Sequence, residues 1–214
     1  MRIKAHASLT DKAYQALVEK IVTLELAPGS VLTESELRRE MKIGRTPIRE
    51  AIQRLIAEGL VTHLHHRGML VADIRAEDVQ QINEFRAQVE GYAARLAAGR
   101  MTPSEIEELQ RIHAGLERSM ADMDAETFIK QDRVFHELLA RGAKNRYLEA
   151  TLLRLYNLHL RLWYYLYKKQ GGLRETVHEH QEVIEALVRR DPEESELAMR
   201  SYVMRLARQI KDVI

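Results

Sequence analysis

Helical periodicity from residue 76 almost to the end of the chain constrains the fold more than any other feature of the sequence. Apolar residues recur with a helical period in six stretches, at about residues 76–99, 103–121, 125–141, 144–169, 173–190 and 193–213. Short breaks such as Gly142-Ala143 and Asp191-Pro192 separate these stretches. Strand signals disappear in this region. It therefore predicts an all-α antiparallel bundle of about six helices, and a mainly α protein overall.

The first 73 residues have a different organisation. A helix that Thr10 can cap is expected to run to about residue 26, and the sequence "APGS" ends it. Thr33 is expected to cap a short second helix, with Glu36 three residues later in a capping-box pattern. After the turn "KIG", a third helix is expected to begin with Thr46 as its cap and Pro47 in the first turn, and to end at Gly59.

A two-stranded hairpin is predicted after the third helix, because "LVTHLHHRGMLVADI" alternates and breaks at Arg67-Gly68. Three helices followed by a hairpin form the order of a winged helix-turn-helix. We therefore expect an N-terminal winged helix-turn-helix domain over residues 1–73 and a helical domain over residues 74–214.

Charge is distributed unevenly along the chain. The formal net charge is only +1, yet residues 38–67 are rich in arginine, and the region from 73 to 126 is acidic. This asymmetry indicates a basic binding head on a more acidic body. The chain has no cysteine, which excludes disulfides and thiolate metal sites. It also has no apolar leader and no uninterrupted apolar run near about 18 residues, so we expect a cytoplasmic protein without a membrane partner.

The third helix is suited to contact double-stranded DNA. A recognition helix enters the major groove with its N-terminus first, and Arg45 and Arg49 lie one turn apart there, within reach of guanine edges or phosphates. A solvated helix face with incidental arginines is the simpler alternative for any single residue. The whole pattern favours DNA contacts from the second and third helices and from the tip of the hairpin, by Thr33, Ser35, Arg45, Thr46, Arg49, His65, Arg67 and Gly68.

Polar residues interrupt the apolar stripes of the C-terminal helices. Unpaired burial of such groups costs several kcal/mol, so they are expected to meet each other, water, a metal or a ligand. Asp132 and His136 lie four residues apart on one helix face, a spacing that lets both hold one ion, and His180 is expected to join them. Arg86 is expected to face an anion or a buried carboxylate. His159 is either an ordinary buried histidine or a further member of this site.

The N-terminal residues resemble the DNA-binding domain of GntR-type bacterial transcription regulators. The resemblance lies in "LTESELRREMKIGRTPIREAIQRLIAEGLVTHLHHRGMLV" and covers about residues 9 to 73. It implies a homodimer that reads an inverted repeat, with Arg45, Thr46, Arg49 and the wing in contact with DNA. The family often has arginine at the position of Ser35.

The helical body resembles the ligand-sensing domain of the FadR-type branch of these regulators, across about residues 75 to 213. The segments "FRAQVEGYAARLAA", "DRVFHELLARGAKNRYL" and "EHQEVIEALVRRDPEESELAMRSYVMRL" carry the match. The resemblance implies a divalent metal beside a carboxylate effector. Asp132, His136 and His180 match three of its metal ligands, and Tyr202 replaces the fourth, a histidine.

These observations predict a dimeric transcription regulator, most simply a repressor, whose affinity for DNA depends on a small organic acid. Arg86, His159 and Tyr202 are the expected effector contacts, and Asp132, His136 and His180 can hold Zn²⁺, Ni²⁺ or Mn²⁺. One alternative is a DNA-binding dimer without an effector. Another is a metal-dependent hydrolase, but no general base is apparent and a DNA-binding head would serve no purpose there. The expectation is that the protein is not an enzyme.

Overall fold

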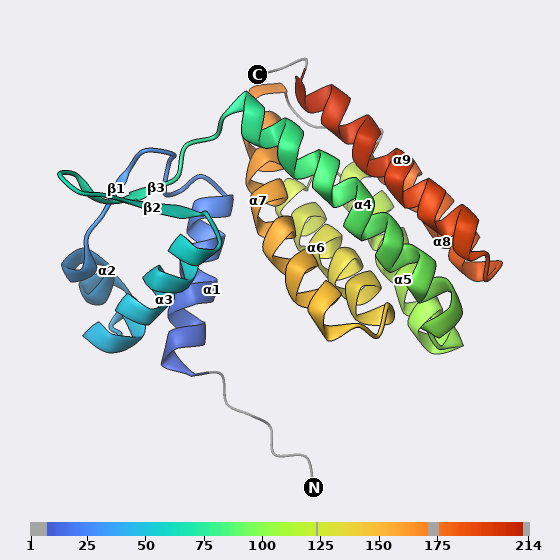
Figure 1. Ribbon diagram of the computed structural model, residues 1–214, viewed down its shortest axis with the longest axis horizontal. Coiled ribbons are helices and arrows are strands. Elements are labelled where there is room, and N and C mark those ends of the chain that lie inside the picture. Colours follow the sequence, from blue (N-terminus) through green and yellow to red (C-terminus); the bar gives the residue numbers. More distant parts are fainter. Residues whose placement is uncertain (1–7, 123, 171–175, 212–214) are drawn as a thin grey trace, which may run out of the picture. The chain divides into compact units, whose positions relative to one another are not determined.

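The computed structural model describes residues 8–122, 124–170 and 176–211 (Figure 1). The chain divides into two compact units, Met1–Ile74 and Arg75–Ile214. The described residues are mainly helical, with helices and a small sheet in the first unit and helices alone in the second. The predicted fold class, a winged helix-turn-helix followed by an all-α bundle, is confirmed.

Within residues 8–74, which the structure describes, the N-terminal unit contains three helices and three short strands. The order is α1 (Leu9–Val22), β1 (Val31–Leu32), α2 (Glu34–Met41), α3 (Arg45–Ala57), β2 (Val61–Leu64) and β3 (Gly68–Val71). Helices α1 and α3 pack directly on each other. Their contact is apolar and fully buried, and it includes Ala13, Leu17, Ile21, Ile48, Ile52 and Leu55. One face of α3 therefore packs on α1, and the opposite face of α3 is exposed to solvent.

The sheet has three strands where the sequence predicted two. The strand order is β1-β3-β2, and both pairs are antiparallel. In β1, Val31 pairs with Leu70 and Leu32 pairs with Met69. A strand of only two residues is too short to produce a visible alternation, and for this reason periodicity missed it. β1 joins the segment before α2 to strand β3 of the hairpin.

Two of the predicted helix starts are wrong. Helix α1 begins at Leu9 with Ser8 as its cap, and Ser8 and Asp11 form a complete capping box. The Thr10 hydroxyl instead donates to the Glu50 carboxylate on α3, at 2.6 Å. Helix α3 begins at Arg45 with Gly44 as its cap, so Thr46 lies inside the first turn and does not cap the helix.

The predicted N-cap residue of α2 is correct, but the hydrogen bonds predicted for its side chain are not. Thr33 is the N-cap residue, but its side chain makes no capping hydrogen bond to the backbone. Its hydroxyl donates to the Glu36 carboxylate. The capping box expected at this position is therefore absent. Helix α1 also ends at Val22, four residues earlier than expected, and Leu24 follows it with a positive φ of 59°.

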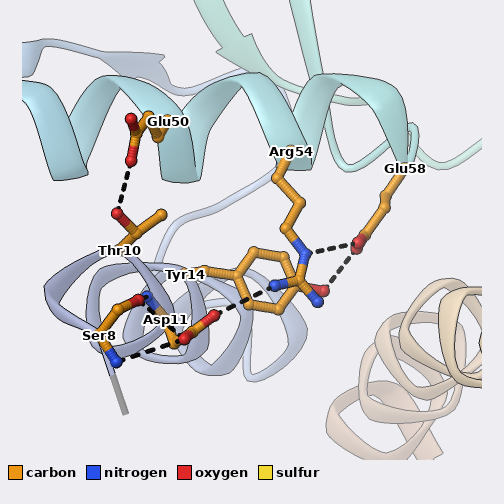
Figure 2. Close-up of polar contacts among 7 residues, drawn as sticks. All are labelled: Ser8, Thr10, Asp11, Tyr14, Glu50, Arg54 and Glu58. Carbon is orange, nitrogen blue, oxygen red and sulfur yellow. Dashed lines mark hydrogen bonds and ion pairs between the residues drawn. The ribbon is translucent and has the colours of Figure 1, made fainter.

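A polar network supplements the apolar contact between α1 and α3 (Figure 2). The Arg54 guanidinium lies 3.6 Å from the centre of the Tyr14 ring, and its Nε donates to Glu58 at 3.2 Å. The Tyr14 hydroxyl donates to the same carboxylate at 2.5 Å, and Asp11 lies 3.6 Å from Arg54. Arg54 thus serves packing within the domain, in contrast to Arg45 and Arg49 on the same helix.

Substitution of Arg54 by alanine is expected to destabilise the N-terminal unit modestly. The side chain is 48% exposed, so the lost cation–π contact and ion pairs amount to about 1 kcal/mol. Thermal unfolding of the full chain should show a small decrease in Tm. Arg39→Ala on the exposed face of α2 is the matched control. Equal melting temperatures for the two variants would contradict a structural role for the Arg54 network.

The C-terminal unit consists of six described helices. They are α4 (Ala76–Arg100), α5 (Pro103–Ala121), α6 (Ala125–Gly142), α7 (Arg146–Gln170), α8 (Thr176–Val188) and α9 (Pro192–Lys211). These bounds agree closely with the predicted ranges. The predicted start at residue 173 and the predicted end at residue 213 lie outside the described residues. None of the helices in the described ranges is long and apolar enough to cross a membrane.

Small residues bring the helices of the bundle close together. Helices α4 and α9 lie side by side over much of their length (Figure 1). At Gly91 on α4, a Cβ atom would stand 2.5 Å from Cγ of Arg200 and 3.2 Å from the backbone oxygen of Glu196, both on α9. Helices α4, α6 and α7 meet at a buried cluster of Ala93, Ala140, Ala143 and Leu152. This tight packing places the polar residues of α4, α6, α7, α8 and α9 in one interior.

Candidate functional site

The predicted DNA-contacting side chains lie on the exposed surface of the N-terminal unit. Arg45 and Arg49 are at the start of α3, with 66% and 59% of their side chains exposed. Thr46 is exposed beside them, and Thr33 and Ser35 are exposed at the start of α2. The beginnings of two helices therefore present donors and cations on one domain, an arrangement suited to phosphates and base edges.

The wing is the turn between β2 and β3. Gly68 has φ of +76°, a conformation that favours glycine, and the backbone N–H of Arg67 donates to Leu64 at 3.1 Å. This tight turn leaves His65 and Arg67 exposed at its tip. The rings of His65 and His66 contact each other edge to face, with centroids 5.0 Å apart. The tip thus presents the Arg67 cation to solvent beside two histidines, which suits a minor-groove contact.

Sequence reasoning missed one residue that contacts the exposed arginines of α3, Glu34 on α2. Its carboxylate accepts hydrogen bonds from Arg45 Nε at 3.3 Å and from Arg49 Nε at 3.1 Å. The hydrogen bond from Arg49, opposed by partial burial, lowers the pKa of Glu34. No pattern within a single helix indicated this pairing, because Glu34 lies on α2 and the arginines lie on α3.

Three of the predicted metal ligands come together inside the C-terminal unit. Asp132 and His136 project from α6 and His180 projects from α8, and all three are buried. The Asp132 Oδ1 atom lies 3.3 Å from Nε2 of His180 and 3.9 Å from Nε2 of His136. One ligand atom from each residue falls within 4.8 Å of the others. The predicted i, i+4 pair and the histidine from another helix therefore share one site.

This group of residues fits a divalent metal. Ligands about 2.1 Å from a tetrahedral ion stand roughly 3.4 Å apart. The two separations from Asp132 Oδ1, 3.3 and 3.9 Å, are near this value, and all three ligand atoms lie within 4.8 Å of one another. Two imidazole nitrogens and one carboxylate oxygen suit Zn²⁺, Ni²⁺ or Mn²⁺. Burial lowers the pKa of His180, although Asp132 opposes this effect. Its imidazole is consequently neutral near pH 7, the form that binds metals.

Two tyrosines contact these ligands. Tyr156 on α7 donates its hydroxyl to Asp132 Oδ2 at 2.5 Å, so Oδ1 is left for the histidine side of the site. Burial, followed by the charge of Asp132, raises the pKa of Tyr156 well above its usual range, and the phenol stays protonated. The Tyr202 hydroxyl lies 3.4 Å from His136 Nε2, where the fourth histidine of the resemblance would be. Sequence reasoning identified Tyr202 but assigned no role to Tyr156.

Arg86 and Glu90 form a buried ion pair on α4 next to His136. Arg86 Nε donates to Glu90 Oε1 at 2.6 Å, and its Nη1 donates to Asn83 at 3.2 Å. Glu90 Oε2 lies 3.4 Å from His136 Nδ1. Burial raises the pKa of Glu90, but the positive charge of Arg86, aided by the contact with His136, outweighs burial and brings the pKa down to about 2. The sequence predicted that Arg86 would meet an anion or a buried carboxylate, and Glu90 is that carboxylate.

Glu90 also lies next to His136, with Oε2 3.4 Å from Nδ1 but without a hydrogen bond between these two atoms in the described residues. A carboxylate next to this nitrogen favours the tautomer that leaves the lone pair of Nε2 for a metal. The signal was present in the sequence, since Arg86 and Glu90 are four residues apart on one helix. It was overlooked because Glu90 does not belong to the apolar stripe.

His159 is buried at 1% exposure but lies outside the Asp132–His136–His180 group. Among the residues that the structure describes, neither His159 Nδ1 nor Arg86 Nη2 has a hydrogen-bond partner. Burial, followed by the charge of Arg86, lowers the pKa of His159 well below its usual range. A cavity of about 10 Å³ lies beside His136, Glu90 and Tyr156, enough for about one water molecule.

The geometry defines a class of protein, a winged-helix DNA-binding regulator with a buried polar site in a separate helical domain. Residues 9–71 match the family described as "Bacterial regulatory proteins, gntR family", and residues 81–205 match the FCD domain. The chain belongs to the GntR family of bacterial regulators, with an FCD domain as its C-terminal unit.

Curated relatives and a solved structure agree with this assignment. The chain is 33% identical over 131 residues to the Nta operon transcriptional regulator of Aminobacter aminovorans, across 61% of this chain and 62% of that protein. It is 27% identical to the transcriptional repressor RspR of Escherichia coli, across 96% and 90% of the two chains. The structure of E. coli McbR/YncC superposes with a TM-score of 0.86 at 22% identity, covering 97% of this chain and 99% of that one. Both curated relatives are named as transcription regulators, which confirms the prediction that this protein is not an enzyme.

Proposed function

We propose that this protein is a homodimeric repressor of the FadR-type branch, which binds an inverted-repeat operator and responds to a small carboxylate. Exposed Arg45 and Arg49 on α3 support operator reading, together with the cationic wing. The name of the relative RspR supports repression. An inverted repeat requires two copies of the head, and light scattering of the full chain measures whether it is a dimer.

The observation that carries the regulatory part is the buried arginine beside the Asp132–His136–His180 group. Arg86 has one guanidinium nitrogen committed to Glu90 and another, Nη2, without a partner among the described residues. A carboxylate can accept from such a nitrogen in a charge-assisted hydrogen bond. His159 Nδ1 and the Tyr202 hydroxyl offer further polar contacts in the same interior.

An organic acid requires more room than the cavity beside His136 offers in this structure. The cavity beside His136 holds about one water molecule, at about 10 Å³. Binding must therefore shift side chains or helices of the bundle, and a ligand that binds one arrangement better than another changes their populations. Such a shift is a physical route from the buried site to the affinity for DNA.

A thermal-shift and DNA-binding screen tests this function. The melting temperature is measured with sugar acids, dicarboxylates and amino acids, each with and without Zn²⁺, Ni²⁺ or Mn²⁺. An acid that raises the melting temperature is then tested for its effect on binding to a duplex that the protein selects from a random library. Arg86→Lys retains a charge beside Glu90 but lacks the planar fork, so it should weaken the response to the acid more than it weakens DNA binding. A protein that selects a duplex but is stabilised by none of these acids would support the DNA-binding dimer without an effector.

Metal binding is expected at Asp132, His136 and His180, and replacement of Tyr202 by histidine should tighten it. Three ligands leave positions open to water or to the effector, and a neutral tyrosine is a poor ligand for these ions. Calorimetric titration of chelator-treated protein with each ion should give weaker binding for the natural chain than for Tyr202→His. The Asp132→Ala/His180→Ala double variant is the control without a site. Absence of binding to both the natural chain and Tyr202→His would mean that the interior is a purely organic site.

A further inference from the structure

Glu34 bridges the two arginines that the proposed function assigns to DNA reading. It is the first residue of α2, and its side chain is 22% exposed. Oε2 accepts from Arg45 Nε at 3.3 Å, and Oε1 accepts from Arg49 Nε at 3.1 Å. Each carboxylate oxygen thus holds one guanidinium, and both contacts use the nitrogen nearest the aliphatic chain.

This geometry affects how the arginines can meet DNA. A guanidinium has five donors, and the bidentate contact with guanine O6 and N7 needs only two of them. Contact through Nε therefore leaves enough donors on the terminal nitrogens. Because Arg45 and Arg49 are 66% and 59% exposed, these outer ends are directed to solvent while Glu34 holds their inner ends. The bridge also restricts the rotamers of two long, flexible side chains.

The charge of Glu34 has a second consequence. Three groups with charges of +1, +1 and −1 carry a net charge of +1, half of what the arginines alone would bring to the phosphate backbone. Non-specific affinity arises almost entirely from phosphate neutralisation, whereas specific affinity adds contacts with base edges. A carboxylate at this position therefore weakens binding to any duplex but leaves the base contacts available, and specificity often depends on such a repulsive element.

We propose, on the basis of the proposed DNA-binding function, that Glu34 is a specificity-determining residue that positions Arg45 and Arg49 for base edges and opposes their use on phosphates. Three other acidic residues, in α2, in α3 and at the end of α3, have different partners. Glu50 and Glu58 face α1, where they accept from Thr10 and Tyr14 (Figure 2). Glu36, on the same helix as Glu34, accepts from Thr33.

The test compares Glu34→Gln with Glu36→Gln in the full-length chain. Both variants remove one negative charge from the exposed start of α2, but only the first breaks the bridge. A random duplex library selected with the natural chain supplies a preferred duplex, and a scrambled duplex of the same composition is the non-specific probe. Binding of each protein to both duplexes is measured over a series of salt concentrations, and thermal unfolding verifies that the variants are folded.

Glu34→Gln is expected to lower the ratio of specific to non-specific affinity roughly tenfold, mainly by tighter binding to the scrambled duplex. Without the Glu34 carboxylate, one or both arginines can contact phosphates of the scrambled duplex. The slope of the logarithm of affinity against the logarithm of salt concentration should then become steeper by about 1 to 2. Glu36→Gln should change both quantities much less. In the Arg45→Ala/Arg49→Ala background, Glu34→Gln should have no more effect on scrambled DNA than Glu36→Gln.

Three results would overturn the inference. The first is an equal ratio and salt slope for Glu34→Gln and Glu36→Gln. The second is a full effect of Glu34→Gln without both arginines, which would assign the effect to simple repulsion of phosphates. Glu34→Asp keeps the charge but is one methylene shorter, so a natural specificity ratio in this variant would also contradict positioning. If the natural chain selects no duplex at all, the proposed function itself fails, and this outcome is distinct from the others.

Discussion

The Arg45→Ala/Arg49→Ala double variant is expected to bind its selected duplex roughly a hundredfold more weakly than the natural chain. Each arginine that reads a base edge contributes about 1–3 kcal/mol, and 1.4 kcal/mol corresponds to a tenfold change. Both side chains share the carboxylate of Glu34, so their single effects are not expected to add. Titration with a labelled duplex, followed by fluorescence anisotropy, measures the loss.

Arg54→Ala is the matched control for this loss, because it removes an arginine from the same helix. Arg54 lies over the Tyr14 ring and pairs with Glu58, on the side of α3 that packs against α1 (Figure 2). Its replacement should reduce stability slightly and leave the affinity for DNA nearly unchanged. Operator binding that survives in the double variant, or an equal loss in Arg54→Ala, would be evidence against α3 as the reading element.

Much of the fold could be predicted because local signals decide it. Helix α5 was expected over residues 103–121 and occupies Pro103–Ala121, since Thr102 and Glu105 form a complete capping box at a proline. Strand β1 could not be predicted, because its two residues are a strand only through pairing with β3. The cap of α1 was misplaced for a similar reason, since the Thr10 hydroxyl is used by Glu50, forty residues away in the sequence.

The residues of the candidate sites also fall into two groups, those that a single helix made predictable and those that only packing brings together. Asp132 and His136 were found because both lie on one helix face, and Arg86 was found because a charge interrupted an apolar stripe. Glu34 and Tyr156 were not assigned roles, because their partners lie on other helices and only the packing brings them together. Spacing along one element is visible in a sequence. Which residues of two helices contact each other is not visible in a sequence, unless each helix has a polar residue on its apolar face.

Substitution of Arg86 by leucine is expected to destabilise the C-terminal unit by about 3–5 kcal/mol. Removal of one partner from a buried ion pair leaves the other charge in a poorly solvating interior. Arg86 is 0% exposed and Glu90 is 5% exposed, so the carboxylate would lose its main partner without gaining water. Denaturant unfolding of the full chain, followed by far-ultraviolet circular dichroism, measures the change. This effect also makes Arg86→Leu unsuitable as a test of the effector, for which Arg86→Lys is the better variant.

The Arg86→Leu/Glu90→Leu double variant should recover most of the loss. Replacement of both members of a buried pair by apolar residues is often neutral or stabilising, whereas replacement of one member is not. Arg86 Nη1 also donates to Asn83, so a residual deficit is expected from that amide. A double variant as unstable as Arg86→Leu would mean that Arg86 acts through packing or through Asn83, and that its pairing with Glu90 contributes little.

The acid dependence of unfolding gives an independent measure of the same pair. The folded-state pKa of Glu90 is lowered from an ordinary value of 4.5 to about 2. A group with a lowered pKa stabilises the folded state above its ordinary pKa, and this contribution is lost as the pH falls toward the folded value. We therefore expect about 3 kcal/mol of stability near pH 7 to disappear between about pH 5 and pH 2 in the natural chain. In the Arg86→Leu/Glu90→Leu variant, the free energy of unfolding should fall less steeply with decreasing pH over that interval. An identical pH dependence in the two proteins would contradict the strong charge coupling between Arg86 and Glu90.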